Sequence, residues 1–252
     1  MEIYPVGTSA GIKLDRADLH LKELRDEVNS GKHQAGGIGY RIDYEKQQLV
    51  VFTEPNDVGL RWSAIAGEVV HQSRSALDHI VWDLIVDNGN TPPDRSGFPV
   101  YWEEAKYNDG VDGMIGGINE QARRIIDGLQ PFGPDYASDP LYLLNEMWNR
   151  DKHRLLNINT FAIQALRVSF RFPDRWRAIM VNFPEGPLPE RAEIERRDLG
   201  FDLPREVPVY GSVAVNHKFV GGPADGKSFL GTLSELRKFT KSVVDKLVAT
   251  AS

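Results

Sequence analysis

Acid–base and cationic side chains cluster in the middle of one long helical pattern. Arg74 and His79 lie there in R-x4-H spacing, and His71, Ser75 and Asp78 lie close to them. An arginine can neutralise a phosphate, and a histidine can transfer a proton near neutral pH. Metal-independent RNA cleavage requires both roles, because a base takes the 2′-OH proton and a cation stabilises the charged phosphorane.

Helical spacing divides these residues into two pairs. Residues four apart are neighbours on a helix, so Arg74 meets Asp78 and Ser75 meets His79. Arg74 and His79 are five apart, about 140° around the axis, so they could flank one groove. The alternative is structural. Arg74 and Asp78 would then form a helix-surface ion pair worth about 0.3–0.5 kcal/mol, and His79 would cap or hydrogen-bond in the core.

A second polar cluster, residues 149–154, lies on a later helical pattern. Asp151 is three or four positions from residues of that helix's inner face: Met147, Trp148 and Leu155. A buried carboxylate needs a partner, because its desolvation costs several kcal/mol. The candidate partners are nearby cations: Arg74, Arg150 and Lys152. The pairing would be either a structural salt bridge between helices or part of a catalytic site, to which His153 is a further candidate contributor.

Motifs for metals and cofactors do not occur. The histidines lie at positions 20, 33, 71, 79, 153 and 217, with no pair at a metal-binding spacing, and there is no cysteine. Phosphate-binding glycine loops and the G-x-S-x-G nucleophile elbow do not occur either. We therefore expect no metal and no cofactor.

Net charge and the distribution of apolar residues limit the partners and the compartment that we expect. The chain has 252 residues and a net charge of −6, which does not favour binding to polyanions except at a local basic patch. The N-terminal residues lack a signal-peptide pattern, and no apolar run reaches the ~18 residues needed to span a bilayer. We therefore expect a cytoplasmic protein that does not contact membranes.

The hydrophobic periodicity predicts an α+β fold in one domain, residues 1–252. Helical patterns at 13–30, 57–88, 118–157 and 228–250 would form a bundle. The 118–157 pattern would break at Pro131, and a new helix would begin at the N-cap and N1 pair Asp139-Pro140. Period-two patterns predict a β-hairpin at 40–54 and a small antiparallel β insertion at 161–222. Residues 89–117 should be irregular, with a short strand at 98–101. Four arginines surround the aromatic residues of the insertion and would make either a basic face or an ordinary solvated one: Arg167, Arg171, Arg175 and Arg177.

The run from Glu68 to His79 resembles the motif helix of the HEPN superfamily, in which R-x4-6-H is common and a polar residue follows the arginine. Arg74, Ser75 and His79 fit that pattern, and residues 149–154 also resemble those of HEPN-like bacterial proteins. The resemblance implies a dimeric, metal-independent endoribonuclease of toxin or phage-defence systems. It implies that Arg74 binds the scissile phosphate and that His79 is the general acid–base, with Ser75 and Asp78 in support.

Two further hypotheses stay open. Many HEPN-like proteins lack activity and serve as binding or assembly modules. The polar clusters would then be structural, and a dimer or the β face would bind a protein partner. The third hypothesis is a small-molecule or nucleotide site in a cleft beside residues 89–117.

Overall fold

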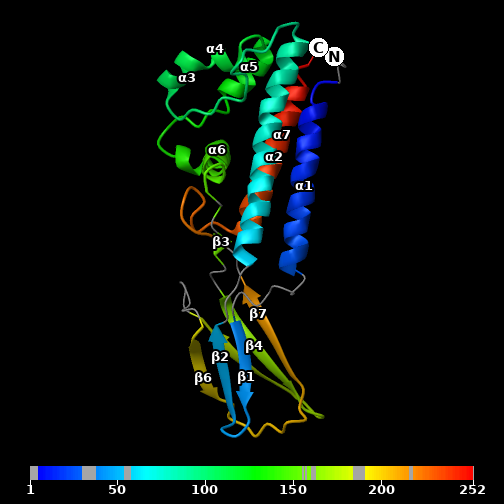
Figure 1. Cartoon of the computed structure of the whole chain (residues 1–252), viewed down its shortest axis with the longest axis vertical. Helices are drawn as coiled ribbons and strands as arrows, with labels where there is room; N and C mark the ends of the chain where they lie inside the picture. The colour runs from blue at the N-terminus through cyan, green and yellow to red at the C-terminus, as the bar shows by residue number, and fades with distance from the viewer. Residues whose placement is uncertain are drawn as a thin grey trace.

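The helices and the two three-stranded antiparallel sheets occupy separate ends of the molecule, while the short β3-β8 pair lies beside the helices, which confirms the predicted α+β class (Figure 1). The computed structural model describes residues 5–29, 38–53, 58–154, 156, 158–159, 163–183, 191–215 and 218–251. The helices are α1 (Thr8–Asn29), α2 (Val58–Asp87), α3 (Glu104–Gly110), α4 (Asp112–Ile115), α5 (Glu120–Asp127), α6 (Pro140–Asp151) and α7 (Phe229–Val248). The strands are β1 (Ile38–Asp43), β2 (Gln48–Thr53), β3 (Ile158–Asn159), β4 (Ile163–Arg171), β5 (Trp176–Asn182), β6 (Glu193–Asp198), β7 (Val209–Val215) and β8 (Lys218–Phe219).

Helix α2 is the spine of the helical end. It packs against α1, α6 and α7, so it buries side chains on more than one stripe, from Trp62 to Ile85. The predicted bounds of 57–88 agree with the structure to within a residue. The helix ends where Gly89 takes a positive φ of 76°, a conformation that glycine adopts without a Cβ clash. Within the part of the chain that the structure describes, no helix is both long enough and apolar enough to cross a membrane.

Other helix ends differ from the predictions. Helix α1 begins at Thr8, five residues before the predicted start. Helix α6 begins at the predicted Pro140, where the Asp139 side chain accepts a hydrogen bond from Leu141 N at 2.7 Å. It ends at Asp151 rather than near residue 157. Turn-type hydrogen bonds follow, including one from His153 N to Arg150 O, so the polar 149–154 cluster straddles a helix terminus.

The connection between α2 and α5 contains two short helices, α3 and α4, where irregular chain was predicted. The predicted strand at 98–101 is wrong. Side chains of α2, rather than a neighbouring strand, satisfy the backbone of the buried Phe98. Its N–H donates to Asp78 at 2.8 Å, and its carbonyl oxygen accepts from Arg74 at 2.7 Å. These bonds fix the connection against α2.

The β end consists of two antiparallel three-stranded sheets, β1-β2-β6 and β5-β4-β7. The predicted hairpin forms β1 and β2. The charged segment 193–198 lies within the predicted β insertion, but it pairs as β6 with β2 of the hairpin rather than with the other strands of the insertion. Apolar side chains of both sheets form a hydrophobic cluster of their own, including Leu49, Val168 and Phe170. Tyr40 of β1 packs over Gly211 of β7, where an added Cβ would lie 2.1 Å from the ring.

The helical residues form a separate hydrophobic cluster. The prediction of a single domain stays a prediction, because two cores are compatible with one domain or with two. What matters for the site is that α2, α6 and the connection 98–114 meet at the helical end, away from the two three-stranded sheets (Figure 1).

Candidate functional site

Arg74 is buried, with 5% of its surface exposed, and groups of the chain itself occupy its guanidinium. Nη1 forms the predicted ion pair with Asp78, and Nη2 donates to the Phe98 carbonyl oxygen. Nε lies 3.5 Å from the Asn145 side-chain oxygen on α6. Arg74 therefore joins α2 to both α6 and the 98–114 connection. The Arg74–Asp78 ion pair is therefore not the solvent-exposed ion pair that the four-residue spacing suggested as the structural alternative.

Two cationic side chains lie against the ring of Trp148 on α6. The Arg74 guanidinium carbon lies 5.1 Å from the ring centre, and the Lys152 ammonium lies 2.9 Å from it. The indole Nε1 donates to His71 Nδ1 at 3.3 Å. Burial lowers the pKa of Lys152, and the charge of Arg74 lowers it further, while Asp78 opposes the shift. Two cations and an imidazole thus surround one aromatic ring near the end of α6.

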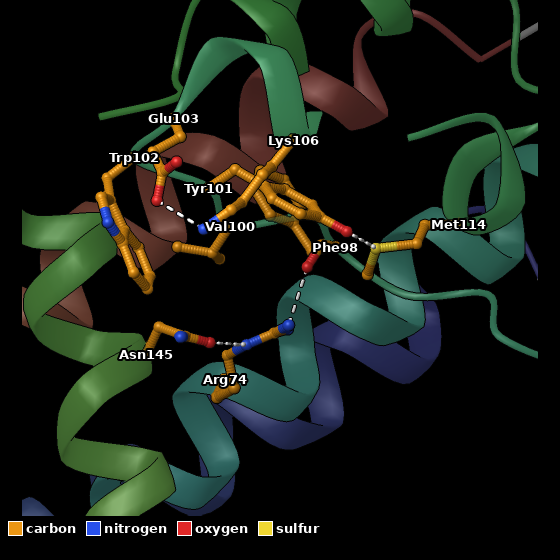
Figure 2. A pocket seen from close by; sticks show the side chains of 9 residues that line it. All are labelled: Arg74, Phe98, Val100, Tyr101, Trp102, Glu103, Lys106, Met114 and Asn145. Carbon is orange, nitrogen blue, oxygen red and sulfur yellow. Dashed lines mark hydrogen bonds and ion pairs between the residues drawn. The ribbon is translucent and has the colours of Figure 1, made fainter. Parts of the chain in front are cut away.

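A pocket of about 350 Å³ opens beside Arg74 (Figure 2). Arg74 and Asn145 lie on one side of it, and the side chains of the connection lie opposite. Its lining residues are Arg74, Phe98, Val100, Tyr101, Trp102, Glu103, Lys106, Met114 and Asn145. Lys106 is paired with Glu103 at 2.6 Å, so both cations of the pocket already face a carboxylate. The pocket is close to neutral and has aromatic walls.

Aromatic contacts hold the outer wall of the pocket. Trp102 stacks on Tyr136 with ring centres 6.0 Å apart, and it meets the edge of Tyr142 at 5.4 Å. The Tyr101 hydroxyl approaches the Met114 sulfur at 3.6 Å. These aromatic residues fix the shape of the opening beside α6.

His79 does not share this site. It is half-buried, and the charged groups that act on its imidazole are Lys13, Asp83 and Asp78. Asp83 accepts hydrogen bonds from Gly7 N and the Ser9 hydroxyl at the start of α1. His79 is therefore on the side of α2 that faces α1, and the side chain that lines the pocket is Arg74. Burial lowers the pKa of His79 and Lys13 lowers it further, so its imidazole is neutral at pH 7.

Ser75 and His79 lie one turn apart on α2, as the helical spacing predicts. Both residues lie in the described part of the chain, and no hydrogen bond joins them. Ser75 is half-buried, and neither residue lines the pocket.

Asp151 forms no ion pair with any of its three candidate partners, Arg74, Arg150 and Lys152, all of which the structure describes. Asp151 packs instead against α2 at Gly67, where an added Cβ would lie 2.3 Å from Oδ1. Burial raises the pKa of Asp151, as does the charge of Glu68, while His71 opposes the shift. His153 is exposed at the turn after α6 and takes no part in the pocket.

The pocket residues other than Arg74 were not singled out from the sequence. A signal was present, because Tyr101, Trp102 and Tyr107 lie close together in a segment predicted to be a long irregular connection. Among the described residues, no group of three or more histidine or acidic side chains could hold a metal ion.

Comparisons of the chain with protein-family models, curated proteins and solved structures found no match.

Proposed function

We propose that the chain is a non-catalytic binding protein that holds a small planar molecule in the pocket beside Arg74. The observation that carries the proposal is that groups of the chain itself already bind the Arg74 guanidinium. Phosphorane stabilisation requires a guanidinium aimed at the transferring phosphate. The Arg74 guanidinium is committed to Asp78, Phe98 and Asn145.

The pocket supplies the chemistry for a planar ligand. Its volume of about 350 Å³ falls within the usual range of small-molecule sites. Tyr101 and Trp102 offer flat apolar surfaces, and the Asn145 amide offers a donor and an acceptor on the opposite side. Because Arg74 and Lys106 are each paired with a carboxylate, a neutral or weakly charged ligand fits better than a polyanion.

A thermal-shift screen of nucleobases, nucleosides and other planar heterocycles tests this function. Binding at the pocket should raise the melting temperature of the wild-type chain, since a ligand stabilises the folded state that binds it. Trp102→Ala should abolish the shift for the same compounds. Trp176→Ala is the matched control, because Trp176 is an exposed tryptophan of β5 that is not part of the pocket. A screen without hits, or hits that survive in Trp102→Ala, would overturn the proposal.

A HEPN-like endoribonuclease is the second candidate, active without metal and assembled as a homodimer. The observation that favours it is the cluster around Trp148. Arg74 and Lys152 bring two positive charges to one ring, and the exposed His71 is hydrogen-bonded to that ring's nitrogen. Together they could serve a phosphate and a proton transfer, with His79 contributed from a second subunit as the resemblance implies.

Incubation of the chain with structured and unstructured RNA in EDTA separates the two candidates. The ribonuclease candidate requires products with cyclic phosphate ends, and it requires their loss in His79→Ala or His71→Ala. The binding-protein proposal requires intact RNA with the wild-type chain. Lys152→Ala is the better cation variant here, because Lys152 is exposed whereas Arg74 supports the fold.

A further inference from the structure

The outer face of the β5-β4-β7 sheet combines exposed aromatic rings with arginines. Alternation along β4 places Leu166, Val168 and Phe170 in the core of the β end, so the residues between them point outward. The outward residues of the three strands form what we term the aromatic–arginine face: Arg167, Ser169, Arg171, Trp176, Ala178, Met180, Asn182, Tyr210 and Ser212.

The strand register brings the large side chains of this face together. Arg171 is paired across the strands with Trp176, and its guanidinium carbon lies 5.9 Å from the Trp176 ring centre. Ser169 is paired with Tyr210 on the other side of β4. Because Ser169 is small, Trp176 and Tyr210 approach each other over it, with ring centres 5.7 Å apart. The two rings and Arg171 therefore form one continuous surface.

Both rings stay open to solvent. Trp176 is 60% exposed and Tyr210 is 49% exposed, and Met180, farther along the same face, is 47% exposed. Buried aromatic side chains stabilise a core, but rings this exposed contribute little to folding. They are available to a ligand.

The charge of the face is positive although the chain as a whole is acidic. No aspartate or glutamate belongs to the face, and Arg167 and Arg171 form no ion pair with any residue that the structure describes. The neighbouring carboxylates are matched by other arginines. Asp174 pairs with Arg175 in the β4–β5 turn, and Glu195 pairs with Arg197 on β6, an edge strand of the other three-stranded sheet.

We propose that the aromatic–arginine face binds single-stranded nucleic acid. Bases stack on Trp176 and Tyr210, and phosphates lie against Arg167 and Arg171. Aromatic rings interleaved with cations suit single strands, because their bases are free to stack and their backbone carries regular negative charge. A duplex keeps its bases stacked internally and gains nothing from the rings. The two arginines are four residues apart, roughly 13 Å along β4, so the face fits a short stretch of strand.

This surface goes beyond the pocket beside Arg74 and does not depend on it. The sheet lies at the end of the molecule opposite α3, α4 and α5 (Figure 1), and no residue is shared between the two sites.

Fluorescence anisotropy with labelled oligonucleotides of one mixed sequence tests the proposal on the full chain at low salt. The probes are single-stranded RNA, single-stranded DNA and the corresponding duplex. Both single strands should bind more tightly than the duplex. A preference for the RNA would show that the 2′-OH is recognised, and equal affinity would show recognition of bases and phosphates alone. Either result supports the proposal.

Variants of exposed residues then locate the binding. Trp176→Ala and Tyr210→Ala should each lower the affinity about 5- to 150-fold, the equivalent of ~1–3 kcal/mol per stacked base. Arg167→Gln and Arg171→Gln should each reduce the slope of log affinity against log salt by about 0.7. The matched controls are Trp102→Ala and Arg124→Gln, which alter exposed residues of the helical end and should bind as the wild type does.

Several results would overturn the proposal. They are duplex binding as tight as single-strand binding, no binding at low salt, or unchanged affinity in Trp176→Ala and Tyr210→Ala with unchanged melting temperatures. Specific binding of a protein at this face with no oligonucleotide binding would also overturn it. The pocket is tested separately, because Trp176→Ala should keep any small-molecule shift and Trp102→Ala should keep oligonucleotide binding.

Discussion

The guanidinium carbon of Arg74 lies 5.1 Å from the centre of the Trp148 ring, so a cation of α2 rests against an aromatic ring of α6. The same guanidinium reaches the Phe98 carbonyl oxygen at 2.7 Å. One side chain thus joins the spine helix, a second helix and the long connection between α2 and α5. Because Arg74 is a buried charge that joins these three elements, its loss should lower the stability of the helical end.

Arg74→Met should lower the free energy of unfolding by about 2–3 kcal/mol. The change leaves the buried Phe98 carbonyl without its donor and the Asp78 carboxylate without its cation. The value is smaller than for a fully buried pair, because 32% of the Asp78 side chain is exposed. Urea unfolding of both proteins measures it.

Arg124→Met is the control for this prediction, since Arg124 and Glu120 form a long, exposed ion pair at 3.9 Å. It should change the stability by less than about 0.5 kcal/mol. Equal effects of the two substitutions would show that Arg74 does not support the fold.

Gly67→Ala should destabilise the protein although alanine normally favours a helix. The added Cβ would lie 2.3 Å from Asp151 Oδ1, so α6 would have to shift or Asp151 would have to rotate away. In Gly11→Ala the added Cβ meets nothing within 4 Å, and that change within α1 should stabilise by up to about 1 kcal/mol. Thermal melting of the two variants should shift in opposite directions, and shifts of the same sign would contradict the packing of Asp151 on α2.

Asp151→Asn should make the protein more stable at pH 7. Burial and Glu68 raise the pKa of Asp151 in the folded state, so ionisation of this carboxyl opposes folding above that pKa. The advantage of asparagine should shrink as the pH falls through the folded-state pKa. It should vanish below the ordinary value of 3.8, where the carboxyl is neutral in both states.

Unfolding measured from pH 3 to pH 8 checks this pH dependence. Asp94→Asn, a change of an exposed carboxyl, serves as control and should give no such profile. An advantage of Asp151→Asn that grew on acidification would contradict the direction of the pKa shift.

Lys13→Met should raise the pKa of His79. Lys13 on α1 adds to the effect of burial in keeping that pKa below its ordinary value of 6.5, so removal of the positive charge should ease protonation. Because the folded-state pKa is lowered, the stability that His79 contributes should be present above pH 6.5 and lost as the pH falls below it. Titration of the imidazole Cε1–H signal by NMR measures the shift. Lys22→Met, which removes a lysine paired with Asp26, should leave the signal unchanged.

Much of the fold follows from local patterns in the sequence. The run from Glu68 to Asn88 contains no glycine or proline, and its apolar spacing determined the long helix α2. The alternation at residues 40–54 determined the β1–β2 hairpin, and Asp139-Pro140 marked the start of α6. The four-residue spacing of Arg74 and Asp78 also determined their ion pair. Each of these depends on interactions within a few residues, so the sequence alone carries them.

Tertiary packing decided the composition of the candidate site. Helical spacing left open whether Arg74 and His79 share a groove, and packing of α1 on one side and α6 on another separated them. Asp151 was expected to pair with a nearby cation, Arg74 being one of three candidates, but α6 ends at that residue and places it over Gly67. The charged segment 193–198 became a strand because β2 offered an edge to pair with. These outcomes depend on contacts between residues that are far apart in the sequence, such as Arg74 and Asn145, and no local periodicity encodes such contacts.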